Sequence, residues 1–284
     1  MKYKITSRGA EIYNLSSFDL AETFDCGQCF RWEASEDSDK PETYEKFSAV
    51  VHGRYTTVYK DGDIFVIENC TEDELRNIFI DYFDLGLDYD AVRNSLIEKL
   101  PILKESAEYA PGIHILSQEP WEALCSFIIS QNNNIPRIKG IISRLCEAFG
   151  EKCGESFTFP SAEALAALEP EDLKDLRAGF RAEYIIDGAK KVADGEVSLE
   201  ELRTMPIESA RETLMKIRGV GPKVAECTLL YGLHRLEAFP IDTWMKKAMS
   251  TLYKGINPTD FGKYAGIAQQ YIFHYARLKA IPRK

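Results

Sequence analysis

The sequence predicts an α+β protein with an N-terminal antiparallel β-sheet domain and flanking helices over residues 1–112, followed by an all-α domain over 113–284. Three observations indicate this division. Residues 46–69 contain strand-like runs joined by a turn signal, apolar residues recur at helical spacing after Thr71, and Ala110-Pro111-Gly112 interrupts the chain. A chain of 284 residues, 45% of them hydrophobic and 28% charged, is long enough for two packed domains.

The strand signals are strongest in a pair of short runs. Arg54–Tyr59 and Ile64–Glu68 are rich in β-branched and aromatic residues. Between them, Asp61-Gly62 offers the positive φ that a tight hairpin turn needs. Phe30–Glu33 and Phe47–Val51 are expected to form further strands of the same sheet.

Helical signals dominate from residue 71 onward. Thr71–Glu74 has the pattern of a capping box and is followed by apolar residues at helical spacing. Ile135–Phe149 presents one apolar face and should end at Gly150. No apolar run is long enough to cross a membrane, and no secretory signal is visible, so a cytoplasmic protein is expected, associated with the nucleoid if the cell is prokaryotic.

The charge of the chain is unevenly distributed. The net charge is -10, yet residues 201–284 carry 14 lysines and arginines against 7 acidic residues. A basic last third is able to dock a polyanion while the acidic remainder keeps the chain soluble, although chance clustering on solvated helix faces would look the same. The seven cysteines are scattered and odd in number, which indicates reduced thiols; Cys26-Gly27-Gln28-Cys29 lacks the further ligands of a zinc site.

A helical hairpin is the most specific local signal. Ile207–Ile217 and Pro222–Leu233 are predicted helices, separated by a turn that contains Gly219, Val220 and Gly221. Bare amides at a helix N-terminus bind phosphate without reading base sequence. The hairpin is therefore interpreted as a DNA-backbone clamp, and a purely structural hairpin is the alternative.

Lys223 and Asp242 are candidate catalytic residues. Lys223 lies at the start of the second hairpin helix, where the helix dipole and Arg218 disfavour the ammonium form and so favour an amine nucleophile. Alone, it would be a phosphate contact. Asp242 is predicted to cap the next helix, and beside Lys223 its carboxylate would also accept a proton or face a developing cation.

These residues resemble the helix-hairpin-helix DNA glycosylases with the Gly-Pro-Asp signature, and within them the 8-oxoguanine DNA glycosylase/lyase family. The resemblance covers most of the chain. It is carried by Gly27-Gln28-Cys29-Phe30-Arg31-Trp32, Ser130-Gln131-Asn132-Asn133-Asn134-Ile135, Gly179-Phe180-Arg181-Ala182, Gly219–Cys227, Pro240-Ile241-Asp242, and Gly266-Ile267-Ala268-Gln269 with Phe273.

The resemblance implies a bifunctional base-excision repair enzyme that excises 8-oxoguanine, preferably opposite cytosine, and cleaves the abasic strand by β-elimination. Lys223 would attack the sugar and form a Schiff base, and Asp242 would stabilise the cationic sugar. The lesion pocket would consist of Gly27, whose carbonyl accepts the N7 hydrogen of oxoguanine, together with Cys227, Gln269 and Phe273. Such attack requires a base that has left the stack.

Four residues match the family's contacts with the opposite base: Asn132, Arg137, Arg181 and the wedge Phe180. Two positions depart from the family pattern. Many members have tyrosine where Phe180 stands, and histidine where Trp244 stands two residues after Asp242. Both departures leave opposite-base selectivity and phosphate binding less defined.

The expected partner is duplex DNA containing oxidised guanine, and a monomer without metal or cofactor is expected. No cysteine follows Cys227, which argues against the iron-sulfur cluster of some relatives. Two alternatives stay open. The same fold would act on an alkylated purine if the pocket were built from stacked aromatics, and a DNA-binding module without catalysis would use the hairpin alone.

Overall fold

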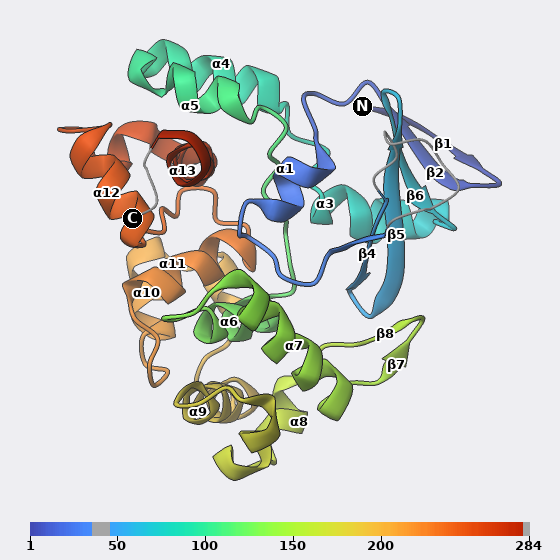
Figure 1. Cartoon of the computed structure of the whole chain (residues 1–284), viewed down its shortest axis with the longest axis vertical. Coiled ribbons are helices and arrows are strands. Elements are labelled where there is room, and N and C mark those ends of the chain that lie inside the picture. Colours follow the sequence, from blue (N-terminus) through green and yellow to red (C-terminus); the bar gives the residue numbers. More distant parts are fainter. Residues whose placement is uncertain (36–45, 281–284) are drawn as a thin grey trace.

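A six-stranded antiparallel sheet forms one side of the molecule and helices form the other (Figure 1). The structure is a computed structural model that describes residues 1–35 and 46–280. The strands lie in the order β1-β2-β6-β5-β4-β3, and each neighbouring pair is antiparallel. Their bounds are β1 Lys2–Thr6, β2 Gly9–Tyr13, β3 Glu33–Ser35, β4 Lys46–Val51, β5 Arg54–Asp61 and β6 Ile64–Glu68.

The central hairpin of the sheet confirms the sequence prediction. Asp61 pairs with Ile64, and Gly62 adopts a φ of 60° in the two-residue turn between them. Strand β4 lies where Phe47–Val51 predicted it. Strands β1 and β2 were not predicted, although Lys2–Thr6 alternates polar and apolar residues as a strand does.

The prediction of a strand over Phe30–Glu33 was wrong, because β3 begins only at Glu33. The preceding residues connect the two halves of the molecule instead. Phe30 packs into the core of the helical half, whereas Trp32 packs into the core beneath the sheet. Arg31, between them, forms a largely buried ion pair with Glu122 at 2.8 Å. Because its side chains pack into separate cores, this segment does not pair with a strand before Glu33.

Short helices cover the inner face of the sheet: α1 Leu20–Asp25, α2 Glu72–Glu74, a π-helical turn over Leu75–Phe79, and α3 Ile80–Tyr82. The capping box predicted at Thr71 is present, with the Thr71 amide donating to Glu74 at 2.8 Å and the Glu74 amide donating to the Thr71 hydroxyl. Phe24 stacks on Trp32 with ring centroids 4.3 Å apart. These contacts close the sheet-side core.

The remaining helices build the larger core. They are α4 Tyr89–Lys99, α5 Lys104–Tyr109, α6 Pro120–Ile129, α7 Ile135–Phe149, α8 Ala162–Ala166, α9 Arg181–Ala193, α10 Ile207–Leu214, α11 Pro222–Tyr231, α12 Thr243–Thr251 and α13 Ala265–Tyr275. Shorter 3-10 turns cover Pro101–Leu103, Pro170–Leu176, Glu201–Arg203 and Pro258–Tyr264, and a π-helical turn covers Ala276–Ala280. A small hairpin pairs β7 Lys152–Cys153 with β8 Ser156–Phe157. Helix α7 ends at Phe149, with the predicted Gly150 as its C-cap.

Residues on both sides of position 112 share the helical core. Buried side chains of α4 and α5, including Tyr89, Leu96 and Ala107, pack in the same cluster as α6 to α13. The division of the chain at residue 112 therefore stays a prediction. Within the described residues, no helix combines the length and apolar composition that crossing a membrane requires.

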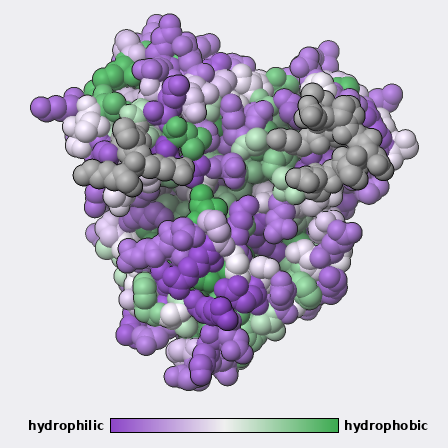
Figure 2. Space-filling view, in the orientation of Figure 1, coloured by the Kyte–Doolittle hydropathy of each residue, from purple (hydrophilic) through white to green (hydrophobic). Residues whose placement is uncertain are grey.

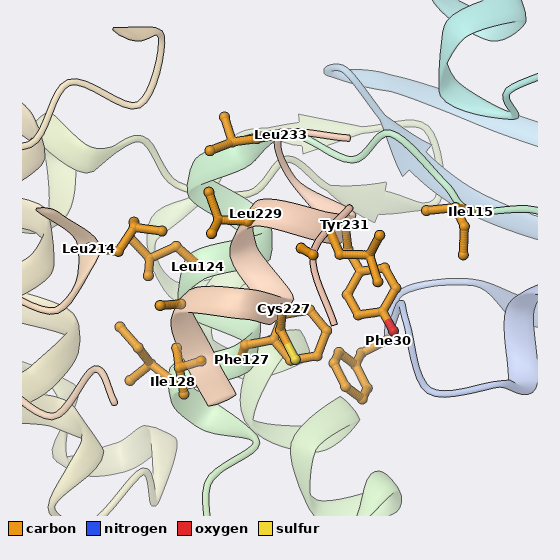
Figure 3. Packing of buried hydrophobic residues seen from close by; sticks show 14 of the residues in the cluster. Phe30, Ile115, Leu124, Phe127, Ile128, Leu214, Cys227, Leu229, Tyr231 and Leu233 are labelled. Carbon is orange, nitrogen blue, oxygen red and sulfur yellow. The ribbon is translucent and has the colours of Figure 1, made fainter. Parts of the chain in front are cut away.

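Helix α11 runs through the middle of this core (Figure 3). On its inner side Tyr231 stacks on Phe127 of α6, with ring centroids 5.3 Å apart, and Phe127 meets Phe30 edge to face at 5.7 Å. All seven cysteines are free thiols, as predicted. Because α11 packs against other helices on several sides, the backbone of its first turn is held in a fixed position.

Candidate active site

The turn between α10 and α11 depends on glycine. Gly219 has a φ of 77°, and a Cβ built at that position would lie 2.1 Å from Cδ2 of Tyr184 on α9. Both conditions exclude a side chain. The Val220 amide donates to the Ile217 carbonyl at 3.0 Å, whereas the amides of Gly219 and Gly221 donate to no other described residue. The Val220 amide, which was predicted to bind phosphate, is therefore occupied within the turn, and phosphate binding by the Gly219 and Gly221 amides stays a prediction.

Lys223 lies in the first turn of α11, directly after Pro222. Its Nζ donates to the hydroxyl of Ser130 at 3.1 Å and lies 4.9 Å from the ring centroid of Phe127. Ser130 ends α6, so the amine is positioned by the helix that packs against α11. Sequence reasoning assigned no role to Ser130 in holding the amine, because the two residues are far apart in the chain.

Asp242 caps α12 as predicted, with its carboxylate accepting from the Met245 amide at 2.8 Å. The segment leading into this cap is fixed by two buried side chains. Glu226 accepts from the Phe239 amide at 2.7 Å, and Gln269 Nε2 donates to the Pro240 carbonyl at 3.1 Å. Since Glu226 lies one helical turn after Lys223, it couples the lysine helix to the Asp242 segment.

Six predicted site residues meet at one small cavity of about 50 Å³. The cavity brings together α11, α13, the segment before α12 and the turn after α1. Its lining consists of the predicted Gly27, Lys223, Cys227, Asp242, Gln269 and Phe273, together with Cys26, Phe127, Tyr231, Pro240 and Gln270, which sequence reasoning did not assign. Spacing along α11 and α13 predicted which residues share a helix face, but not that these two faces meet.

Gly27 enters the cavity from the turn after α1. Its φ is 84°, and a Cβ there would lie 3.5 Å from Cε1 of Phe273, which is ordinary contact. The next residue, Gln28, is fully buried; its Nε2 donates to the His114 carbonyl at 2.7 Å and its Oε1 accepts from the Leu116 amide at 2.9 Å. The position of Gly27 is therefore fixed by a glutamine that links the turn to the segment His114–Leu116, which precedes α6.

Cys227 forms a wall of the cavity one turn beyond Lys223. Burial raises the pKa of its thiol to about 11, an effect that the nearby Lys223 charge only reduces. A thiol with that pKa is protonated at neutral pH and is a weak nucleophile. Cys227 is therefore a poor candidate for the nucleophile, and Lys223 stays the predicted one.

None of the four predicted opposite-base residues lines the cavity. Phe180 is 48% exposed, and the Arg181 guanidinium lies 4.5 Å from its ring centroid. Arg181 itself is 2% exposed and donates to the carbonyls of Gln131, Asn132 and Ala178. In this structure Arg181 braces the Asn132 loop, so its contact with cytosine stays a prediction.

The other two members of this group are exposed. Asn132 has a φ of 47°, and Arg137 lies in the first turn of α7 and donates weakly to the Arg177 carbonyl at 3.4 Å. Both side chains are free to meet a ligand at this surface. Among residues 1–35 and 46–280, no group of three or more acidic, histidine or cysteine side chains is arranged to hold a metal ion.

These features define a helix-hairpin-helix protein with an amine and a carboxylate at a pocket. Residues 125–260 match the model of the HhH-GPD superfamily of base excision DNA repair proteins, and residues 12–124 match the N-terminal domain of 8-oxoguanine DNA glycosylase. An N-glycosylase/DNA lyase of Saccharomyces cerevisiae is 33% identical over 278 residues, covering 89% of this chain and 72% of the yeast protein. The chain belongs to the 8-oxoguanine DNA glycosylase family.

Two solved structures share the fold over nearly the whole chain. The 8-oxoguanine glycosylase/lyase of Clostridium acetobutylicum, in complex with double-stranded DNA containing cytosine opposite 8-oxoguanine, is 35% identical with a TM-score of 0.88, covering 98% of both chains. MBOgg1, in complex with a low-affinity DNA ligand, is 40% identical with a TM-score of 0.88, covering 98% of this chain and 99% of that one. These likenesses confirm the α+β fold that the sequence predicted.

Proposed function

We propose that this chain excises 8-oxoguanine from duplex DNA and cleaves the resulting abasic strand. The observation that carries the proposal is the meeting of Lys223 and Asp242 at one cavity with Gly27, Gln269 and Phe273. A nucleophile, a carboxylate and a base-sized set of walls at one site are what removal of an everted base requires. The work of such an enzyme lies at the chromosome, which in a prokaryotic cell is the nucleoid.

Lys223 supplies the bond-forming step. Its neutral amine attacks C1′ of the everted nucleotide, the bond from C1′ to the base breaks, and the base leaves with the electron pair and a proton. Loss of the ring oxygen from C1′ then gives a Schiff base between Nζ and the opened sugar. Removal of a proton from C2′ expels the 3′ phosphate by β-elimination. The Ser130 hydroxyl, which accepts from Nζ, orients the amine for the first step.

Asp242 has a second task beyond capping α12. Its Oδ1 accepts from the Met245 amide, and the carboxylate, which lines the cavity, retains further acceptor capacity. Positive charge develops on the sugar as the base departs, and a fixed carboxylate stabilises that charge more than it stabilises the ground state.

The lesion is recognised by the walls of the cavity. Oxoguanine has a hydrogen on N7 that guanine lacks, and the Gly27 carbonyl is the acceptor for it. Guanine would place the lone pair of N7 against that carbonyl oxygen, which repels it. The difference favours 8-oxoguanine over guanine by about 1–3 kcal/mol. Phe273 and Cys227 cover the two faces of the base. A cavity of about 50 Å³ holds no more than a water or two, so we expect Phe273 to move aside on binding.

The DNA is held at two further places. The free amides of Gly219 and Gly221 bind a backbone phosphate, which fixes position without reading sequence. The exposed ring of Phe180 fills the space that the everted nucleotide leaves, and Asn132 with Arg137 contacts the unpaired cytosine. Most of the face in Figure 2 is hydrophilic, which suits contact with a solvated duplex.

The test is a panel of duplexes, each with one damaged base opposite cytosine, assayed for base release with and without borohydride. We expect release of 8-oxoguanine and a covalent adduct that borohydride traps. Lys223→Gln should abolish both while leaving duplex binding nearly unchanged. The exposed Lys216, in the same hairpin, is the matched control: Lys216→Gln should weaken binding but still yield the adduct.

Each contrary result points to a defined alternative. Release of an alkylated purine instead of 8-oxoguanine would assign the fold to the other substrate class. An adduct that survives in Lys223→Gln would exclude Lys223 as the nucleophile. Binding without release of any base would leave a DNA-binding module.

A further inference from the structure

Helix α13 places two glutamines side by side at the cavity, and their hydrogen bonding differs. Gln269 is satisfied at both ends: its Nε2 donates to the Pro240 carbonyl at 3.1 Å, and its Oε1 accepts from the Tyr231 hydroxyl at 3.3 Å. Gln270 is 1% exposed, and its Nε2 donates to Sγ of Cys26 at 3.0 Å and to the Cys26 carbonyl at 3.4 Å. Its Oε1 has no hydrogen-bond partner among the described residues.

A buried acceptor without a donor is unfavourable, and proteins rarely retain one without compensation. Gln270 is one of the residues that line the cavity, so an occupant of the cavity is available to supply the donor. Among the walls of this cavity, Gln270 belongs to the side formed by Cys26 and Gly27. It therefore contacts the turn that presents the Gly27 carbonyl, the group that distinguishes an oxidised purine.

The other bonds of this turn make it responsive to Gln270. The Cys26 thiol donates to the Thr23 carbonyl at 3.2 Å while its sulfur accepts from Gln270, so the thiol is fixed from two directions. Gly27 has a φ of 84°, which permits backbone rotations that other residues resist. A conformationally free glycine needs restraint from its neighbours, and Gln28 on one side and Gln270 on the other supply it.

We propose that Gln270 is a further specificity-determining residue of this site. Its amide group holds the Cys26–Gly27 turn so that the Gly27 carbonyl meets the N7 hydrogen of the lesion, and its side-chain oxygen accepts a hydrogen bond from a donor on the same base. This inference rests on the proposed function. It predicts that discrimination at the base is controlled by residues on opposite ends of the sequence.

The experiment compares Gln270→Met, which keeps the length of the side chain but removes its hydrogen bonds, with the wild type. Single-turnover release from an 8-oxoguanine:C duplex should slow by roughly 10- to 100-fold. Borohydride trapping on a duplex with a preformed abasic site should change by less than about threefold, because no base has to be recognised there. Melting temperatures of both proteins are measured in parallel.

Two controls separate this role from general structure. Tyr271→Phe alters a fully buried hydroxyl on the same helix that does not line the cavity, and it should leave base release unchanged. Gln270→Glu retains an acceptor but turns the donor into a second acceptor opposite the Cys26 carbonyl, so it should be as slow as Gln270→Met. Full activity of Gln270→Glu would overturn the restraint of the turn.

Parallel loss of base release and abasic-site trapping in Gln270→Met would assign Gln270 a structural role only and overturn the proposal. Unchanged release would overturn it as well. Failure of the underlying function is distinguishable, because the wild type would then release no 8-oxoguanine before any variant is compared.

Discussion

Replacing Gly219 with alanine tests whether the hairpin turn positions more than a phosphate. The residue has a φ of 77°, which an L side chain adopts only with strain. The new Cβ would also lie 2.1 Å from Cδ2 and 2.3 Å from Cε2 of Tyr184, so the ring must shift. Tyr184 in turn meets Phe180 edge to face at 5.5 Å. The substitution therefore acts on the hairpin and on the predicted wedge together.

The magnitude follows from these two terms. A left-handed conformation costs an alanine about 1–2 kcal/mol, and overpacking adds about 1–3 kcal/mol. The unfolding free energy should fall by roughly 2–5 kcal/mol, which lowers Tm by about 4–10 °C for a chain of this size. Gly221 offers a matched control, since its φ lies outside the left-handed range and a Cβ there meets nothing within 4 Å.

The assay combines thermal unfolding with single-turnover base release. Gly219→Ala should have a melting temperature well below that of the wild type and release 8-oxoguanine more slowly. The unfolding free energy of Gly221→Ala should stay within about 1 kcal/mol of the wild-type value. Gly221→Ala is expected to weaken duplex binding, because its methyl group would stand beside the free amides. Equal melting temperatures for the two variants would refute the argument from φ and from the Tyr184 contact.

Three other expectations concern the carboxylate of Asp242, the buried His274 and the basic C-terminal third of the chain. Asp242→Asn should keep the helix cap, with stability within about 0.5 kcal/mol, but slow base release by at least about 100-fold; equal losses of binding and release would leave Asp242 a cap only. Burial lowers the pKa of His274 to about 4, so the folded state binds its proton less readily than the unfolded chain. Stability should therefore fall by about 3 kcal/mol as the pH drops from 6.5 to 4, and His274→Phe should remove that part of a denaturant-derived pH profile; an unchanged slope would contradict it. Duplex binding should weaken by at least about 10-fold between 50 and 200 mM salt, measured by fluorescence anisotropy, and a flat response would contradict the phosphate clamp.

The elements predicted correctly were those whose signals are local. Asp61-Gly62 specified a tight turn because glycine tolerates positive φ, and the Asp242 cap and the capping box at Thr71 depend on residues within a few positions of one another. The misplaced strand at Phe30–Glu33 shows the limit of such reasoning. Phe30 and Trp32 pack into two different cores, so the segment connects the two halves of the molecule instead of forming a strand. Only the packing of the folded chain decides this.

The candidate site divides in the same way. Turn chemistry and helical spacing in the sequence alone placed Lys223 at a helix start and Cys227 on its face, because those relations are set by neighbouring backbone geometry. Folding decided that Ser130 holds the amine, that Glu226 fixes the segment before Asp242, and that Gln270 reaches the turn at Cys26, 244 residues away. Such contacts join helices through a common core, and no local propensity encodes which faces will meet.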